Sequence, residues 1–598
     1  MNRLSAPSVL FLVAVSVLLL TDRGNAQPFW SQWARNAQHT GMVNIAGQQL
    51  NNKIADIVYD PFTQQEQNES GGELLAHYQA TLIDGNSFYM MKKSGTYPSC
   101  MPNGLWEYGF PCGPNAWNLV QWNVVRYNWQ QNTPVVVWTF PTDWKPEPNA
   151  SNYLLGQVGL QGWEPVFHPV LANGSLYVPG AGGTLWKVNT LTGKALSHIN
   201  PFSGASINPA NTFVSGPLTA DNSGNIYYNV IELNTNGNPW EQNDVAGAWL
   251  VKVTPNGSAA TVTYATLVPN APPAKSISCL GTFADLGDGG ASLPWPPVGV
   301  ASPPKVICGS QRPGVNVAPA VAPDGTVYDV SVAHFDGLVA YLVAVNPDLT
   351  VKWVASLQNR LTDGCGVLLP IAPKGVNDEP NSCRYGTAVG VDPTTNARGS
   401  GGVYDEASST PTVLPDGSVL FAAVDNYNFS RGHLFHFDAA GNFLNAYTFG
   451  WDSTAGVYQH DGTYSVLIKD NHYGGPAYCY FNNPVCASLP PGPYYVSQLN
   501  ASLQVEWSFQ NTTLDQNHPN GYEWCVNAPV IDVNGLVYVT SEDGNIYSVA
   551  QGHHGVFTQW QQRLFLKEAL GAAYTPLSIG GDGKVYSQND GHLFVVGN

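Results

Sequence analysis

Extended apolar runs in this chain end repeatedly at a glycine, and the residues that follow alternate between polar and apolar types. In five copies the glycine is followed after two residues by Tyr; these copies begin at Gly174, Gly224, Gly325, Gly535 and Gly583. Three weaker copies, at Gly85, Gly417 and Gly462, each keep Asp directly before the glycine. A unit that recurs this often predicts a repeat architecture.

Each copy predicts a β-hairpin, because Asp-Gly or Asn-Gly between two alternating runs is typical of a tight turn with positive φ. A third extended run follows the hairpin, as in Thr184–Val188, and then a fourth, as in Val351–Trp353. Four antiparallel strands in about 45–50 residues describe one blade of a propeller. The expected fold class is therefore all-β, a single β-propeller of eight four-stranded blades, with seven blades as the alternative.

Several segments carry a family resemblance. Pro169–Val178, Gly183–Val188 and Thr192–Lys194 resemble the blade repeat of the pyrroloquinoline quinone (PQQ) repeat-like family, of the quinoprotein dehydrogenase-like superfamily, and Trp30–Gly41 resembles its N-terminal strand. The resemblance implies that an N-terminal strand completes the last blade, which stops at Leu593–Val596 without a fourth strand. It covers most of residues 29–598. It implies a fold more than a function, because the family includes quinone enzymes, assembly scaffolds and cofactor-free proteins.

Composition and the N-terminus set the expected environment. Residues 1–26 read as a secretory signal peptide, with Arg3, the apolar run Val9–Leu20 and a small-residue site at Gly24–Ala26. No later run is long enough for a transmembrane segment. The formal charge of −18 and the lack of basic runs argue against nucleic-acid binding. We expect residues 27–598 to form one monomeric domain, secreted, or periplasmic if the source is bacterial.

Four insertions interrupt the repeat, near residues 93–118, 268–315, 358–407 and 470–492. They fall either between strands two and three of a blade or between consecutive blades, and strand alternation sends both kinds of connection to one face. Each insertion holds two cysteines, which suggests four local disulfides, although connectivity stays open: Cys100 and Cys112, Cys279 and Cys308, Cys365 and Cys383, Cys479 and Cys486. Cys525 is left over, as a buried thiol or a residue near that face.

A second regularity points to the propeller axis. Five blades carry an acid four to six residues before the position of the blade proline: Glu73, Glu164, Glu406, Asp452 and Glu523. Such acids at the channel mouth could hold Ca²⁺ or a cationic or polyhydroxyl ligand. Trp163 and Trp524, beside two of them, offer stacking surfaces, and His168 could line the channel. The alternative is that the acids cap turns and the tryptophans pack between blades.

Three functions remain open. The favoured one is a non-enzymatic protein that binds a glycan, protein or small molecule through the elaborated face. The family resemblance also allows a PQQ- and Ca²⁺-dependent dehydrogenase of alcohols or sugars, with Asp405, Glu406 or Asp452 as base, although no adjacent cysteine pair is present. An extracytoplasmic assembly scaffold is the third, without the lipid-accepting cysteine of its relatives. No metal-binding or hydrolase motif occurs.

Seven Asn-x-Ser/Thr sequons follow the signal peptide and predict glycosylation only in a eukaryotic secretory pathway. They begin at Asn68, Asn149, Asn173, Asn256, Asn428, Asn500 and Asn511.

Overall fold

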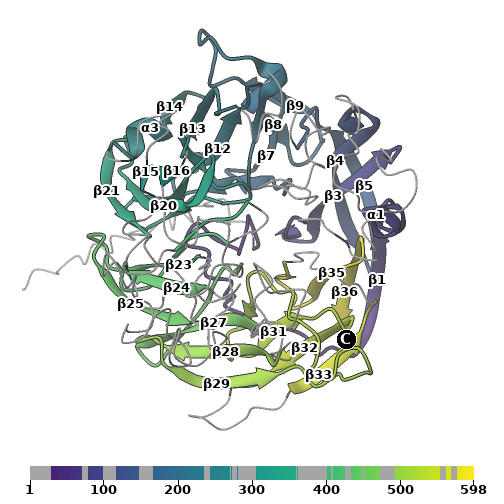
Figure 1. The fold of residues 1–598 in the computed structure, drawn as a ribbon. Helices are drawn as coiled ribbons and strands as arrows, with labels where there is room; N and C mark the ends of the chain where they lie inside the picture. Colours follow the sequence, from purple (N-terminus) through teal and green to yellow (C-terminus); the bar gives the residue numbers. More distant parts are fainter. Residues whose placement is uncertain are drawn as a thin grey trace, which may run out of the picture.

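The computed structural model describes residues 29–69, 74, 78–97, 116–146, 166–234, 243–269, 271, 279–280, 305–306, 308–357, 360, 401–405, 409–423, 432–448, 452–471, 492–551, 560–567 and 576–598. These residues form eight antiparallel sheets of four or five strands arranged as a ring (Figure 1). The prediction of an all-β propeller with eight blades is confirmed, and the seven-blade alternative is excluded.

The first four blades follow one another along the chain, and within each blade the strands are ordered from the axis outward. Their strands are β2 (Leu82–Asp84), β3 (Ser87–Gly95), β4 (Val120–Gln130), β5 (Thr133–Pro141); β6 (Val170–Ala172), β7 (Ser175–Pro179), β8 (Leu185–Asn189), β9 (Ala195–Ile199); β10 (Thr212–Val214), β11 (Thr219–Ala220), β12 (Ile226–Glu232), β13 (Gly247–Val253), β14 (Ala259–Thr263); and β17 (Gln311–Pro313), β18 (Ala320–Val321), β19 (Val327–Ala333), β20 (Asp336–Val345), β21 (Val351–Ser356). In blades three and four the innermost strand is split in two.

The remaining blades repeat this order. Their strands are β22 (Thr412–Val413), β23 (Val419–Ala423), β24 (His433–Phe437), β25 (Phe443–Thr448); β26 (Gly456–His460), β27 (Thr463–Asn471), β28 (Tyr494–Asn500), β29 (Val505–Gln510); β30 (Val530–Ile531), β31 (Val537–Thr540), β32 (Asn545–Val549), β33 (Trp560–Phe565); and β34 (Ser578–Ile579), β35 (Val585–Asn589), β36 (His592–Gly597), β1 (Asn52–Val58). Outside the blades lie the hairpin β15 (Cys279–Leu280) and β16 (Lys305–Val306) and the helical turns α1 (Thr63–Glu69), α3 (Tyr264–Leu267), η1 (Ala116–Leu119), η2 (Ala181–Gly183) and η3 (Pro209–Asn211).

An N-terminal strand closes the ring, as predicted. Strand β1 pairs antiparallel with β36 and becomes the outermost strand of blade eight (Figure 1). The closing strand lies at residues 52–58, after the Trp30–Gly41 segment that carries the family resemblance. Since β1 is mostly exposed, its sequence has little apolar alternation.

Residues 30–48 instead thread through the centre of the ring, drawn in purple in Figure 1. Their carbonyl oxygens accept hydrogen bonds from the innermost strands of six blades, namely from the backbone N–H of Ile83, Leu171, Val321, Val413, Val457 and Ile531 at 2.7–3.1 Å. In blade three the Gln32 side chain forms hydrogen bonds with the backbone of Ala220. In blade eight Gln48 N donates to Gly583 O. Since the innermost strand of a blade has an unpaired edge, this segment supplies hydrogen-bond partners to the inner edges of blades one to seven in chain order, and in blade eight it bonds the turn that follows β34.

The repeat residues have the roles that their pattern predicts. The eight turn glycines all have positive φ, between 58° and 86°. The repeat tyrosines are at most 2% exposed and pack between sheets: Tyr177, Tyr227, Tyr328, Tyr538 and Tyr586. No helix in the described ranges is long and apolar enough to cross a membrane.

Candidate functional site

Two faces of the propeller follow from its topology. The insertions near 93–118 and 470–492 join strands two and three of their blades, β3 to β4 and β27 to β28. Those near 268–315 and 358–407 join the fourth strand of one blade to the next blade. In antiparallel sheets these connections leave at the same end, which we call the insertion face. The turns between strands one and two lie at the opposite end, the turn face.

The predicted channel-mouth residues fall into two groups. Glu73, Trp163, Glu164 and Glu406 lie outside the described residues. His168, Asp405, Asp452, Glu523 and Trp524 are described, and all of them except Glu523 are fully buried.

Asp405 is neutralised by a buried arginine. Arg312 Nη1 and Nη2 donate to the two carboxylate oxygens of Asp405 at 2.8 and 2.5 Å, and both side chains are at most 4% exposed. The backbone N–H of Val315 also donates to Asp405 Oδ1, while Arg312 Nε donates to His334 Nδ1. This bidentate pair ties the linker before blade five to blade four. A carboxylate held in this way is a structural ion and not the accessible base that the dehydrogenase alternative requires.

Asp452 is paired in the same manner. Its carboxylate lies 3.0 Å from Lys469 Nζ near the end of β27, and both side chains are at most 3% exposed. A third pair, which the sequence did not reveal, joins Asp60 and Lys93 at 2.6 Å. Lys93 and Lys469 occupy equivalent positions near the ends of second strands, directly before two of the insertions. Buried lysines therefore anchor the bases of these two insertions.

Trp524 packs in the interior, which is the alternative that the sequence left open beside an exposed stacking surface. Its ring lies between Phe509 and Tyr547, with centroids 5.7 and 5.2 Å away, and it is 0% exposed. The Asn471 side chain accepts a hydrogen bond from Trp524 N and donates one to Trp524 O. Glu523, beside it, is half-buried.

Cys525 is a free cysteine with a buried side chain, 6% exposed. Burial, followed by the negative charge of Glu542, raises the pKa of this thiol well above its usual value. Its Sγ donates to Glu542 Oε1 at 3.5 Å. These surroundings favour an unreactive thiol over a functional one.

The axis on the insertion side is filled by Trp33. This side chain is 1% exposed and belongs to a buried apolar cluster with Val166, Ala318 and Ala528, from the inner edges of blades two, four and seven. His168 packs edge-on against Trp33, with ring centroids 5.7 Å apart. Burial lowers the pKa of His168 to about 4, so the ring is neutral at pH 7.

His39 is the second buried histidine of the axis. Its Nδ1 lies 2.7 Å from Pro411 O, and burial lowers its pKa to about 4. Sequence reasoning missed His39 because it belongs to no repeat copy.

The described residues do not fit a quinone with Ca²⁺ at the axis. Such a site needs an open space flanked by carboxylates, whereas Trp33 fills the axis on the insertion side, and Asp405 and Asp452 are each committed to a buried cation. Within the described ranges no three His, Cys, Asp or Glu side chains are grouped as metal ligands.

The remaining predictions concern covalent modification. Cys308 is disulfide-bonded, and its pairing with Cys279 stays a prediction; the other six insertion cysteines lie outside the described residues. Of the sequons, Asn68, Asn173 and Asn256 are exposed, Asn500 is half-buried, and Asn149 and Asn428 are not described. Asn511 is 1% exposed and its Nδ2 donates to Ser541 Oγ, so a glycan there requires that side chain to leave its position.

Comparisons with known proteins support the propeller fold and nothing beyond it. No protein-family profile matches the chain, and no curated protein matches its sequence. The structure is similar to a europium-containing methanol dehydrogenase (10% identity, 93% of this chain and 89% of that one, TM-score 0.48). It is also similar to BamB from Moraxella catarrhalis (14%, 92% and 99%, 0.36) and to Saccharomyces cerevisiae Sqt1 (10%, 93% and 100%, 0.40). At these values the similarities carry no argument about activity, and membership of the PQQ repeat-like family stays a prediction.

Proposed function

We propose that this protein is a secreted, non-enzymatic propeller that binds a glycan or another protein through its insertion face. The observation that carries the proposal is the contrast between the axis and that face. Trp33 fills the axis on the insertion side, while the ends of all four insertions leave the sheets on that same side. Long connections on one face of a rigid scaffold are where recognition usually resides.

The buried ion pairs support this proposal over the dehydrogenase. Two of the three acids considered as base, Asp405 and Asp452, are held by Arg312 and Lys469 away from solvent. A general base must reach the proton that it removes, and a carboxylate inside a buried ion pair does not. The same pairs would hold in place the residues at which the insertions join the blades, which favours a preorganised recognition surface.

A binding screen with loop variants tests the proposal. Residues 27–598 are applied to a glycan array and to an array of extracellular proteins. In two variants a short Gly-Ser-Asn turn replaces residues 98–115 or residues 472–491, each of which removes a complete cysteine pair. The control variant shortens residues 552–559, which join β32 to β33 on the turn face. We expect binding that at least one insertion variant loses and the control keeps. Absence of binding on both arrays, or binding that neither insertion variant changes, would overturn the proposal.

A further inference from the structure

A buried carboxyl group that the repeat pattern does not require lies at the junction of blades three and four. The residue after the repeat tyrosine carries no charge in the other clean copies, where it is Val178, Tyr228, Val539 or Ser587. In blade four it is Asp329, on β19, and this side chain is fully buried. Burying a carboxyl group is costly unless the group is neutral or fully bonded, so its surroundings indicate its role.

Asp329 belongs to a closed cycle of three buried side chains. Its Oδ2 lies 2.7 Å from Tyr264 Oη, which in turn lies 2.9 Å from Asn229 Oδ1. Asn229 Nδ2 completes the cycle at 3.2 Å from Asp329 Oδ1 and also lies 3.4 Å from Val317 O. Asn229 is on β12, and Tyr264 is the first residue of α3. The cycle therefore joins blade three, α3 and blade four.

The number of hydrogens in this cycle favours a protonated Asp329. Tyr264 has one hydroxyl hydrogen, which it cannot donate to Asp329 and to Asn229 Oδ1 at the same time. When Asp329 is protonated, the acid donates to Tyr264 Oη and the phenol donates to Asn229 Oδ1. When Asp329 is ionised, the phenol must donate to the carboxylate, and Asn229 Oδ1 loses its one donor among the described residues. Turning the Asn229 amide over does not help, because its oxygen would then face Asp329 Oδ1 and Val317 O.

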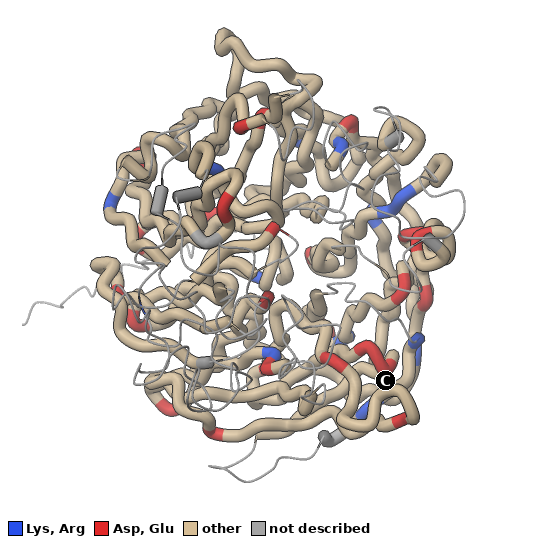
Figure 2. The backbone as a smooth tube through the Cα atoms, viewed as in Figure 1, with Lys and Arg blue, Asp and Glu red and all other residues tan. Residues whose placement is uncertain are grey.

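No cation among the described residues contacts Asp329. Lysine and arginine are sparse around the ring (Figure 2), and the third group that bonds the carboxyl, Val330 N, is also neutral. Burial raises the pKa of Asp329 to about 7. The charged side chains of the strands packed around it bond elsewhere or do not contact it: Glu232 on β12 accepts from Asn208 N, Lys252 on β13 donates to Pro347 O, Arg312 on β17 pairs with Asp405, and Asp336 on β20 makes no contact with Asp329.

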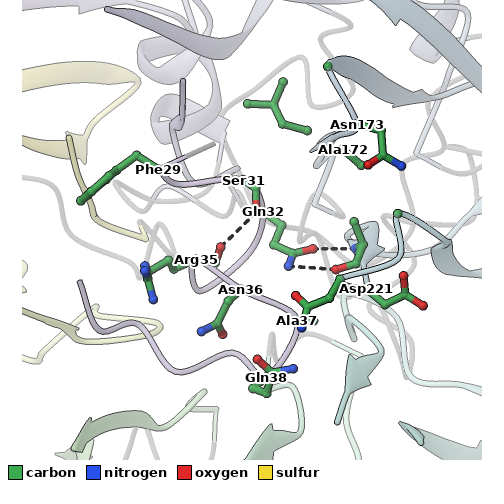
Figure 3. A pocket seen from close by; sticks show the side chains of 15 residues that line it. Phe29, Ser31, Gln32, Arg35, Asn36, Ala37, Gln38, Ala172, Asn173 and Asp221 are labelled. Atoms are coloured by element: carbon green, nitrogen blue, oxygen red, sulfur yellow. Dashed lines mark hydrogen bonds between the residues drawn. The ribbon is translucent and has the colours of Figure 1, made fainter. Parts of the chain in front are cut away.

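A pocket at the axis on the turn face, the turn-face pocket, does not supply a counter-ion either. Its volume is about 250 Å³, and it lies between the start of the threaded segment and the first turns of blades two and three (Figure 3). Its charged lining residues are Arg35 and Asp221. The Arg35 guanidinium points away from these turns in Figure 3, and Asp221 accepts from Ser223 N and Asn225 N at 2.9 Å within its own turn. In the described ranges, only a proton neutralises Asp329.

We propose that the cycle of Asp329, Tyr264 and Asn229 is a pH-sensitive latch, which holds α3 against blade four while Asp329 is protonated and releases it when Asp329 ionises. Helix α3 follows the fourth strand of blade three and therefore lies on the insertion face. Because the closed latch binds the proton more tightly than the open one, it is strongest below about pH 4 and weakens as the pH rises through about 7. This device goes beyond ligand binding and does not depend on which ligand the insertion face takes.

Hydrogen exchange of residues 27–598, followed by mass spectrometry, tests the proposal. The readout is the protection of the peptide that contains Val268, whose N–H donates to Tyr264 O at 3.0 Å, after division by the intrinsic exchange rate at each pH. From pH 5 to 7 this protection should fall by at least about tenfold and then level off. Asp329→Asn should abolish the fall, because its amide donates to Tyr264 Oη as the protonated acid does. Asp348→Asn, in an exposed turn of blade four, is the matched control and should keep the fall.

Infrared difference spectra of the wild type between pH 6 and 8 give a second measurement. A neutral carboxylic acid has a carbonyl stretch that a carboxylate lacks, so we expect this band at pH 6 and its loss at pH 8. Circular dichroism checks that each variant is folded, and the two wild-type measurements decide the outcome if Asp329→Asn is not. Equal protection of the wild type at pH 5 and 7, the same fall in Asp329→Asn, or no acid band at pH 6 would each overturn the proposal.

Discussion

The side-chain amide of Gln32 forms both backbone hydrogen bonds of Ala220. Gln32 Oε1 accepts from Ala220 N at 2.6 Å, and Gln32 Nε2 donates to Ala220 O at 3.2 Å. In blade three a side chain therefore does what the threaded backbone does at the inner edges of blades one, two and four to seven. The N-terminal segment is thus a structural part of the ring.

Replacing Gln32 with Leu should destabilise the propeller. Both Ala220 backbone groups would be left buried without a partner, at a cost of about 2–4 kcal/mol in the free energy of unfolding. Urea denaturation followed by tryptophan fluorescence measures the loss. Gln64→Leu makes the same change on the exposed side of α1 and should cost less than about 0.5 kcal/mol. Equal stability of the two variants would show that the threaded segment does not support blade three.

Asp452→Asn should destabilise the protein because it removes the carboxylate that lies 3.0 Å from the buried Lys469 ammonium. Removing one partner of a buried pair typically costs about 3–5 kcal/mol. Asp461→Asn, at a side chain that is 95% exposed in the first turn of the same blade, is the control and should be nearly neutral. The midpoint of urea unfolding distinguishes these outcomes. A neutral Asp452→Asn variant would mean that the pair does not anchor the insertion.

Asp329 should make the protein less stable as the pH rises. Burial raises its pKa to about 7, and its hydrogen-bond partners Tyr264, Asn229 and Val330 N are neutral. The folded state thus binds the proton more tightly than the unfolded chain. Stability from this group is complete below about pH 4 and is lost as the pH rises through about 7. The Asp329→Asn variant should gain stability over the wild type with rising pH across this window, measured by urea unfolding. A constant difference would contradict the shifted pKa.

His39 should act in the opposite direction. Because its pKa is lowered to about 4, its contribution is complete above about pH 6.5 and is lost as the pH falls through about 4. His39→Asn keeps a donor toward Pro411 O and a residue type that tolerates the observed φ of 62°, but does not titrate. Relative to the wild type, this variant should therefore gain stability between pH 6.5 and 4. The same unfolding series, extended to pH 4, measures the gain, and parallel curves would argue against a neutral buried His39.

Local sequence patterns predict the blades but not the threaded segment that contacts several blades. The Asp-Gly and Asn-Gly turns predict the hairpins because each signal is contained in a few adjacent residues. Residues 30–48 bond a different blade every one to seven residues and include left-handed Ala34, Arg35 and His39, so they lack strand periodicity. Their position depends on a ring that exists only after folding.

The buried partners of the candidate site residues were not predicted, because they lie far from those residues in the sequence. The sequence identifies an acid such as Asp405 but not its partner Arg312, which lies 93 positions away. A usable signal was the presence of Lys93 and Lys469 near the ends of apolar strands, in a chain with only 24 basic residues. Basic residues in such positions are rarely buried without a paired acid. The turn-face pocket left no signal, because its lining comes from three separate segments.

Reconstitution with PQQ and Ca²⁺ tests most directly the claim that the residues at the axis have a structural role and do not form a quinone site. Residues 27–598 are titrated with both, quinone absorbance is followed, and alcohols and aldose sugars are then supplied with an artificial electron acceptor. We predict no saturable absorbance change and no substrate-dependent reduction of the acceptor above a protein-free control. One-to-one quinone binding, with turnover that Asp405→Asn abolishes while Asp461→Asn does not, would contradict the account.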